Sequence, residues 1–245
     1  MQGKRADQLL VERGLAESRA RAQALILAGK VFTGDRRVVK AGDALPPNAP
    51  MEVRGQDHPW VSRGGVKLAA ALAQFGLSPR DRVCLDVGAS TGGFTHVLLA
   101  GGARRVYAVD VGHGQLAWSL RQDPRVVVHE RTNARYLTAG TIGEPIEALT
   151  CDASFIGLAT VLPAPLALCA PGAWAVALIK PQFEAGPGAV GKGGVVRDRA
   201  VHHAVCARVT AWWSALEGWQ VLGVADSPIT GPEGNREFLI AARRG

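Results

Sequence analysis

The stretch from Leu85 to Phe94, LDVGASTGGF, has the composition of a nucleotide-binding loop. An apolar strand ends at Asp86, a loop with three glycines follows, and a helix begins after it. Glycines let backbone amides approach a ligand closely, and a helix N-terminus offers unpaired N–H groups to an anionic moiety. A second strand, RVYAVD, ends at Asp110, where nucleotide folds place an acid on a ribose. The two segments predict a pocket for a nucleoside cofactor.

The spacing of the glycines disfavours a dinucleotide. The loop reads G-x-x-x-G-G, whereas a dinucleotide fingerprint has a glycine in the middle position. Gly88 to Gly92 also spell the G-x-S-x-G of serine hydrolases, with Ser90 as nucleophile. Asp152 and His202 or His203 could complete a triad, but no HGGG-type segment precedes the serine. A purely structural strand-to-helix turn is the third interpretation.

Polar side chains also end two later strands. Asp152 ends the segment EALTCD, and Lys180 ends the apolar run AWAVALI. Ligands of open α/β sheets bind outside the carboxyl ends of the strands, so both residues should lie near Asp86 and Asp110. Lys180 is therefore a candidate for proton transfer, and a lysine that merely extends its ammonium group to water is the alternative.

Alternating strands and helices must position these groups. The predicted strands are residues 82–86, 105–110, 125–130, 147–152, 172–180, 219–225 and 236–242, and the predicted helices are 65–75, 94–100, 115–121 and 200–216. This alternation indicates a mostly parallel sheet covered on both faces. The last two strands are joined by too short a loop for a crossover helix, so they should be antiparallel. An α/β, Rossmann-like, seven-stranded sheet with an antiparallel last strand is typical of S-adenosylmethionine-dependent methyltransferases.

The first fifty residues have a different pattern. They predict a helix from Asp7 to Arg13, a second helix capped by Ser18, and a hairpin that turns at residues 34–35. Residues 1–40 hold nine Lys and Arg against four acids, which in isolation indicates a solvated basic face. The run from Arg5 to Leu45, however, resembles the alpha-L RNA-binding motif of a small ribosomal-subunit protein and of pseudouridine synthases. That resemblance implies RNA-phosphate contacts by Arg5, Arg19, Arg21 and Lys30.

Three prolines at 46, 47 and 50, followed by polar residues, indicate a linker. We therefore predict a small α+β RNA-binding domain at 1–50, a linker at 51–60 and a methyltransferase domain at 61–245. Trp60 is expected to pack where the domains meet.

Composition narrows the possible partners. A net charge of +7 favours an anionic partner, nucleic acid before membrane. Four cysteines without CxxC spacing, and no signal peptide, fit a reduced cytoplasmic location. The uncharged segment from Phe155 to Ile179 is long enough to cross a bilayer, but its prolines indicate a buried helix, a turn and a buried strand. No membrane or protein partner is expected.

Eight ordered segments resemble the TlyA family of ribosomal RNA 2'-O-methyltransferases, an FtsJ-like class often described as haemolysins. These segments are SRGGVKL (62–68), DVGASTGGFT (86–95), DVGHGQL (110–116), ERTNAR (130–135), CDASFIGL (151–158), KPQFEAG (180–186), GGVVRD (193–198) and GPEGNREF (231–238). The resemblance implies methylation of a cytidine ribose 2'-hydroxyl in 23S ribosomal RNA, free or in the ribosomal subunit, and leaves open whether 16S ribosomal RNA is a second substrate.

The resemblance also implies a catalytic tetrad of Lys67, Asp152, Lys180 and Glu237. A ribose hydroxyl is a poor nucleophile until its proton is removed or its developing charge is stabilised. Two roles stay open for Lys180. It accepts the proton, or it stabilises the alkoxide while Asp152 accepts the proton.

For the cofactor, S-adenosyl-L-methionine, the resemblance assigns the glycine loop to the methionine end, Asp110 to the ribose and Asn133 to the adenine. The expected cofactor contacts are Asp86, Gly88, Ser90, Gly92, Gly93, Phe94, Asp110 and Asn133. No metal site is expected, because His113 has no second ligand at metal-site spacing.

Departures from the family pattern concern the cofactor site more than the tetrad. His113 stands where the family more often has an aromatic residue, and Gly157 where serine is common. The chain ends close after its last strand, which resembles the shorter subtype, expected to act on 23S rRNA alone. Two rivals remain: a non-catalytic rRNA-binding or assembly factor and a membrane-acting haemolysin.

Overall fold

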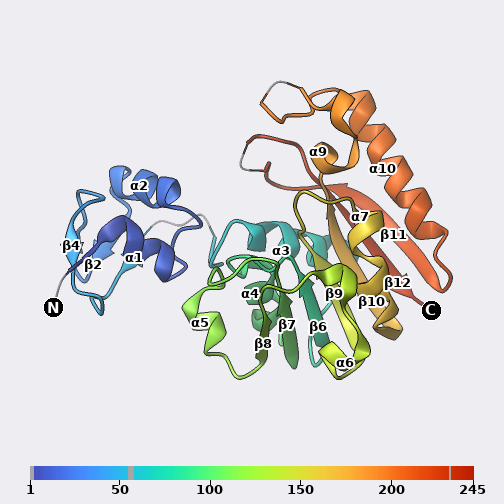
Figure 1. The fold of residues 1–245 in the computed structure, drawn as a ribbon, viewed down its shortest axis with the longest axis horizontal. Coiled ribbons are helices and arrows are strands. Elements are labelled where there is room, and N and C mark those ends of the chain that lie inside the picture. The colour runs from blue at the N-terminus through green and yellow to red at the C-terminus, as the bar shows by residue number, and fades with distance from the viewer. Residues whose placement is uncertain (1–2, 55–57, 192, 232) are drawn as a thin grey trace.

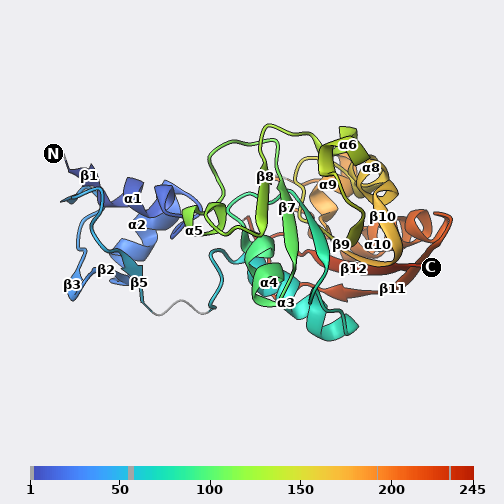
Figure 2. The ribbon, with the colours of Figure 1, turned by 90° about the horizontal axis from the view of Figure 1, so that it is seen from below.

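The computed structural model describes residues 3–54, 58–191, 193–231 and 233–245. An N-terminal domain and a larger C-terminal domain follow one another along the long axis (Figures 1 and 2). The elements of the N-terminal domain are β1 (Lys4–Arg5), α1 (Ala6–Glu12), α2 (Arg19–Leu27), β2 (Val31–Thr33), β3 (Arg36–Arg37), β4 (Ala44–Leu45) and β5 (Glu52–Val53).

The predicted helices and hairpin of the N-terminal domain are confirmed. Ser18 caps α2, since its hydroxyl accepts a hydrogen bond from the backbone N–H of Arg21 at 3.1 Å. β2 and β3 pair in an antiparallel hairpin. The two-residue strands β1, β4 and β5 were not predicted, because such short pieces carry no periodicity. β5 pairs with β2, so the first residues of the predicted linker belong to the N-terminal sheet. Residues 55–57 of that linker lie outside the described residues.

The C-terminal domain is an α/β sheet structure, as predicted. Its elements are α3 (Gly64–Phe75), β6 (Val83–Val87), α4 (Gly93–Ala100), β7 (Arg105–Val109), α5 (Trp118–Arg121), β8 (Val126–His129), η1 (Ala134–Tyr136), α6 (Ala139–Ile142), β9 (Ile146–Cys151), α7 (Leu158–Val161), α8 (Pro163–Ala167), β10 (Cys169–Ile179), α9 (Pro181–Glu184), η2 (Pro187–Ala189), α10 (Arg199–Ser214), β11 (Trp219–Asp226) and β12 (Phe238–Arg244). The seven strands lie in the order β11-β12-β10-β9-β6-β7-β8. β12 is antiparallel to both neighbours, whereas β10, β9, β6, β7 and β8 pair in parallel, which confirms the predicted reversal.

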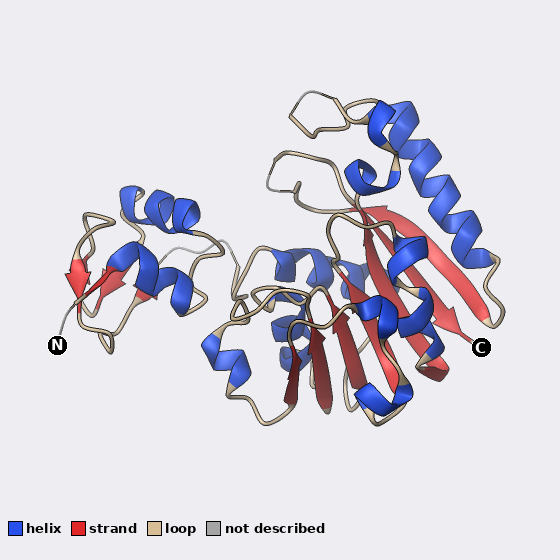
Figure 3. Cartoon of the chain, viewed as in Figure 1, coloured by secondary structure: helices blue, strands red, loops and turns tan. Residues whose placement is uncertain are grey.

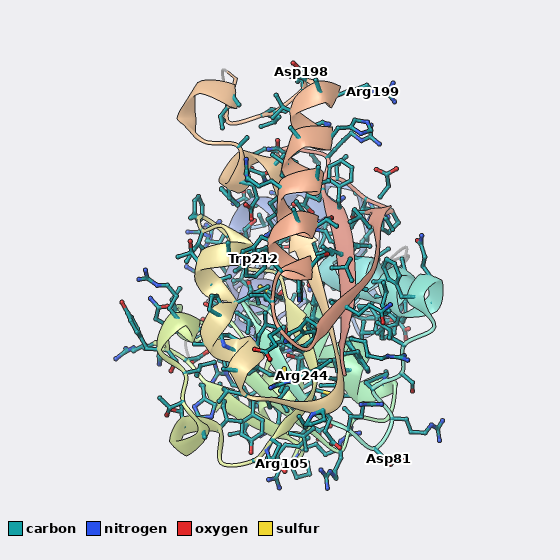
Figure 4. All side chains as sticks on the ribbon, turned by 90° about the vertical axis from the view of Figure 1, so that its right-hand side faces the viewer. Asp81, Arg105, Asp198, Arg199, Trp212 and Arg244 are labelled. Atoms are coloured by element: carbon teal, nitrogen blue, oxygen red, sulfur yellow. The ribbon has the colours of Figure 1, made fainter. Side chains whose placement is uncertain are left out.

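Helices cover both faces of this sheet (Figure 3). One core lies between the strands and α3, α4 and α5, and the other lies between the strands and α6, α7, α8 and α10. α10 spans its face from Asp198 and Arg199 at one end towards Trp212 at the other (Figure 4). Asp198 caps this helix, because its carboxylate accepts a hydrogen bond from the N–H of Ala200 at 2.8 Å. The carboxyl ends of the parallel strands stay open to ligands between these layers.

Two predicted segments differ in detail. The helix expected from Gln115 begins only at Trp118, because the N–H of Ala117 donates to the Thr91 carbonyl at 3.1 Å and holds the preceding turn. The segment from Phe155 to Ile179 forms α7, α8 and β10, so it contains two short helices before the strand. Across the described ranges, no helix combines the length and apolar character that a membrane crossing needs.

The cysteines are free thiols, and three of them are buried. Burial raises the pKa of Cys84, Cys151 and Cys169 to about 12. These thiols are therefore inert core residues rather than nucleophiles.

Candidate active site

The four residues of the predicted tetrad line one cavity of about 210 Å³. Lys67 projects from the first turn of α3, whose N-terminus lies beside the glycine loop. Asp152 and Lys180 directly follow β9 and β10, and Glu237 directly precedes β12. Because β12 runs antiparallel to β10, its first residue lies beside the last residue of β10. Reversal of the last strand thus brings a fourth polar side chain to the edge at which the parallel strands end.

Lys180 and Asp152 form one ion pair of this cavity. Lys180 Nζ lies 2.7 Å from Asp152 Oδ1. It also donates hydrogen bonds to Ser154 Oγ at 2.9 Å and to the Asp152 carbonyl oxygen at 3.3 Å. The lysine side chain is 9 % exposed and the aspartate side chain 22 % exposed, so the ion pair is largely shielded from water where it lines the cavity.

Lys67 and Glu237 form the second ion pair. Lys67 Nζ donates to Glu237 Oε2, and both side chains are buried. Gly231 lies against the same carboxylate, because a Cβ at this position would be 2.7 Å from Glu237 Oε1. The cavity is therefore lined by two lysine–carboxylate pairs with separate partners.

A second cavity of about 390 Å³ adjoins the first. The lining residues common to both are Gly88, Ser90, Asp152 and Ser154. Gly88 has a φ of +79°, and a Cβ there would lie 3.0 Å from the backbone of residues 152 and 153. Only glycine fits this approach of two strand ends, so the strand-to-loop turn is sterically specified.

Asp110 organises the wall of the second cavity. Its carboxylate accepts hydrogen bonds from the N–H of Ser90 at 2.8 Å and from the N–H of Gly112 at 2.7 Å. Each carboxylate oxygen has a further lone-pair direction, because an ionised carboxylate has about four acceptor sites. Asn133 lines the same cavity and caps η1, with Oδ1 accepting from the N–H of Arg135 at 3.1 Å.

Two of the expected cofactor contacts lie outside both cavity linings. Asp86 is fully buried, and its carboxylate accepts hydrogen bonds from Thr95 Oγ1 at 2.6 Å and from Thr150 Oγ1 at 3.0 Å. Burial raises the pKa of Asp86 to about 6. Gly92 has a φ of +95° and faces Leu120 of α5, 2.3 Å from the position of a Cβ. Asp86 and Gly92 thus support the loop from the side of the core, whereas Gly93 and Phe94 line the first cavity with Gly88 and Ser90.

The geometry argues against a hydrolase. Ser90 adopts a φ of +47°, as a nucleophile elbow does, but its hydroxyl bonds to Gln115 Oε1 at 3.2 Å. His202 and His203 both lie on α10, where His202 bonds to the carbonyl of Val196, and neither histidine lines either cavity. Ser90 therefore has no histidine base in this arrangement.

The four predicted RNA contacts divide into two pairs. Arg5 and Arg19 both bind the carboxylate of Asp7, at 3.0 and 3.1 Å, and their side chains are 47 % and 54 % exposed. The Arg5 guanidinium holds the pKa of the buried Asp7 carboxyl well below its usual range. Arg21 and Lys30 instead line a groove between the domains.

This interdomain groove has a volume of about 430 Å³. Its other polar lining includes Glu17, His58 and Arg63. The residues that it shares with the first cavity are Glu17, Ser62, Arg63 and Ile229. The N-terminal domain also touches the turn before α5, where a Cβ at Gly14 would lie 2.5 Å from the Cβ of Ala117. The Trp60 ring packs within the C-terminal domain, where it meets His96 of α4 edge-on at 5.5 Å, and its predicted contact with the N-terminal domain stays a prediction.

Several lining residues were not predicted from the sequence. Among the polar ones are Glu17, Ser62, Arg63, Thr91, Ser154 and Thr230 of the first cavity and Gln115 of the second cavity. All of these except Glu17 and Thr230 stand inside segments that were recognised, so their position in a motif was the available signal. Among the described residues, no three His, Cys, Asp or Glu side chains group as a metal site would.

Comparison with known proteins places the chain in a family. Residues 60–244 match the FtsJ-like methyltransferase model, and residues 4–49 match the S4 domain. The chain is 50 % identical over 240 residues to the 16S/23S rRNA (cytidine-2'-O)-methyltransferase TlyA of Mycobacterium tuberculosis, covering 98 % of this chain and 89 % of that protein. It is 36 % identical over 190 residues to the 23S rRNA (cytidine-2'-O)-methyltransferase TlyA of Campylobacter jejuni, covering 74 % and 69 %. A solved structure from Streptococcus thermophilus, described as a hemolysin, matches with a TM-score of 0.77 and 42 % identity, covering 100 % of this chain and 89 % of that one.

Proposed function

The chain belongs to the FtsJ-like methyltransferase family, and on that premise we propose that it methylates the 2'-hydroxyl of a cytidine ribose in ribosomal RNA, with S-adenosyl-L-methionine as methyl donor. The observation that carries this proposal is the junction of two cavities. The first, which we call the catalytic cavity, holds two lysine–carboxylate pairs, and the second is built by the glycine loop and Asp110. The two cavities share Gly88, Ser90, Asp152 and Ser154. A methyl donor and an acceptor hydroxyl would meet at that junction.

The second cavity suits the cofactor in shape and chemistry. Gly88 leaves the space that a Cβ would fill, and Asp110 is held by two backbone N–H groups with lone pairs left for ribose hydroxyls. Asn133 and the apolar side chain of Ile156 line the same cavity and suit a base ring. S-adenosylmethionine supplies an activated sulfonium methyl group, so the protein needs to supply alignment and a proton acceptor.

The two ion pairs divide this work in our proposal. Three oxygens surround Lys180 Nζ, namely Asp152 Oδ1, the Asp152 carbonyl and Ser154 Oγ, and these contacts hold the Nζ group in place at the cavity. Lys180 then stabilises negative charge on the ribose oxygen, and Asp152, the more exposed member of the pair, accepts the proton. Lys67 adds positive charge to the same cavity and is oriented by Glu237.

The N-terminal domain would hold the RNA through phosphates. Arg21 and Lys30 line the groove that continues into the catalytic cavity, and the exposed portions of Arg5 and Arg19 extend the basic surface. Such contacts position a substrate without reading its sequence. The net charge of +7 supports the same partner, and ribosomal RNA places the activity in the cytoplasm.

We propose 23S rRNA as the substrate, because both related methyltransferases are named for it. The names differ on 16S rRNA, which is included for the Mycobacterium tuberculosis protein and not for the Campylobacter jejuni protein. Action on 16S rRNA is therefore left to the experiment.

The test is incubation of the full chain with tritiated S-adenosylmethionine and separate unmethylated 16S and 23S rRNA, each free and in its ribosomal subunit. We expect label on the 2'-oxygen of a cytidine in 23S rRNA. The modified nucleotide is located by mapping the ribose that resists alkaline hydrolysis. Lys180→Ala serves as the matched inactive chain. Binding of rRNA without label in any substrate would instead support an assembly factor, and leakage of liposomes without added cofactor would support a haemolysin.

A further inference from the structure

Two loops meet beside the catalytic cavity, and the proposed function uses only one residue of them. The first contains residues 193–198, GGVVRD, between η2 and α10, and the second joins β11 to β12 and ends at Glu237. They project together from the same side of the sheet (Figure 1). Ile229 and Thr230 of the second loop line the catalytic cavity. The packing of these loops therefore determines one wall of the cavity.

Asn235 joins the two loops. Its side chain is 1 % exposed. Oδ1 accepts a hydrogen bond from the N–H of Val196 at 3.0 Å, and Nδ2 donates one to the carbonyl of Gly194 at 3.0 Å. A carboxamide offers one acceptor and donors side by side, so it satisfies an N–H and a carbonyl of the neighbouring backbone at once. A carboxylate, which only accepts, cannot make the second bond.

The 193–198 segment is also fixed from its other side. His202 of α10 is 4 % exposed, and its Nε2 donates a hydrogen bond to the carbonyl of Val196 at 3.0 Å. Val196 itself is 2 % exposed. The segment that Asn235 binds is thus also hydrogen-bonded to α10. The second loop is therefore attached, through Asn235, to a segment that is itself held in place.

Asn235 also connects to the catalytic Glu237. The backbone carbonyl of Asn235 accepts from the N–H of Gly231 at 2.9 Å, and Gly231 packs directly against the Glu237 carboxylate. The Glu237 carbonyl in turn accepts from the N–H of Ser227 at 3.0 Å. The turn that contains Gly231 therefore lies against Glu237. This turn is held at one end by Asn235 and at the other by the hydrogen bond of Ser227, where the pairing of β11 with β12 begins.

We propose that Asn235 is a positioning residue for methyl transfer: it fixes the turn at Gly231 on the GGVVRD segment and so holds Glu237, and through it Lys67, in place. Asn235 lines neither cavity, so it acts through Glu237 rather than on the substrate. The inference rests on the proposed methyltransferase activity. The proposed role accounts for the amide side chain two residues before Glu237 in the second loop and for the packing of the two loops against each other.

The first test compares Asn235→Ala with the natural chain in methyl transfer to rRNA. We expect kcat to fall about tenfold or more, with the KM for rRNA and the cofactor affinity within about threefold, because only the alignment of Glu237 is lost. Tyr107→Phe is the matched control, since it removes a partly buried hydrogen bond to Glu144, 2.8 Å long, from a strand far from these loops. We expect it to keep kcat.

The second test is a double-mutant cycle with Glu237→Gln. If Asn235 acts through Glu237, Asn235→Ala combined with Glu237→Gln loses no more activity than Glu237→Gln alone. Multiplied losses would overturn the proposal, and so would an Asn235→Ala chain with unchanged kcat.

Asn235→Asp provides the measurement if Asn235→Ala does not fold. It retains the acceptor for Val196 and loses the donor to Gly194, so an intermediate fall in kcat and the same lack of additivity are expected. An aspartate chain with full kcat would overturn the inference. A natural chain that labels no rRNA would refute the proposed function itself, whereas an active natural chain with multiplied losses would refute only the role of Asn235.

Discussion

Replacement of Asp86 by asparagine is expected to stabilise the C-terminal domain above pH 6. The Asp86 carboxyl is fully buried between Thr95 and Thr150, and burial raises its pKa from the usual 3.8 to about 6. Asparagine has the shape of the protonated acid and carries no charge. A shift of about two pKa units corresponds to roughly 3 kcal/mol between the charged and neutral forms. This is the expected gain in the free energy of unfolding of Asp86→Asn at pH 8.

The gain has a defined dependence on pH. Below about pH 4 the carboxyl is protonated in the folded and unfolded chains, so the natural chain and the variant should be equally stable with respect to this group. As the pH rises from about 4 to about 6, the unfolded chain releases its proton more readily than the folded chain, so the free energy of unfolding of the natural chain falls. Above pH 6 the difference is constant.

Tryptophan fluorescence during thermal unfolding measures this effect in the relevant domain, because all six tryptophans lie at or beyond residue 60. For a domain of this size, 3 kcal/mol corresponds to about 6 to 12 °C in Tm. Glu217→Gln, which removes an exposed carboxylate, is the matched control and should leave Tm unchanged. An Asp86→Asn chain that melts at or below the natural chain at pH 8 would refute the reasoning. A cofactor affinity reduced about tenfold by the same change would show that Asp86 contacts the cofactor after all.

Three further changes test the remaining parts of the site. Lys180→Ala should reduce methyl transfer about a hundredfold or more while the cofactor affinity is kept, and full activity on rRNA would contradict its role. Asp110→Ala should weaken cofactor binding at least about tenfold in calorimetry, because the carboxylate holds both the Ser90 and the Gly112 amides. Arg21→Ala should weaken rRNA binding evenly across sequences and reduce the salt slope by about one, and an unchanged slope would remove it from the phosphate contacts.

The relative directions of the strands could be predicted because each has a local cause, whereas their order in the sheet was not predicted. Alternating apolar runs and helical stretches require a parallel sheet, and the short connection before β12 requires a reversed last strand. Ser18 could be recognised as a cap from its type and place alone. The two-residue strands β1, β4 and β5 could not, since pairing between distant segments creates them.

The candidate site was partly accessible in the same way. Asp110, Asp152 and Lys180 end predicted strands, so the general rule for open sheets places them at one edge. Lys67 and Glu237 have no such local signal, and only resemblance to a family indicated them. The pairing of Lys67 with Glu237 and of Lys180 with Asp152 depends on side chains separated by 170 and 28 positions along the chain.

The sequence by itself determined that a glycine loop follows a buried strand, that an acid follows the next strand, and that a basic domain precedes both, because residue type and spacing carry this information. Only the tertiary structure decided which polar groups face a cavity. Both acids were expected at strand ends, but Asp86 lies inside β6 and turns into the core to meet Thr95 and Thr150, whereas Asp152 directly follows β9 and turns to Lys180. Which way such a side chain points depends on the neighbours that distant segments bring to it, and that information is absent from any local stretch of the chain.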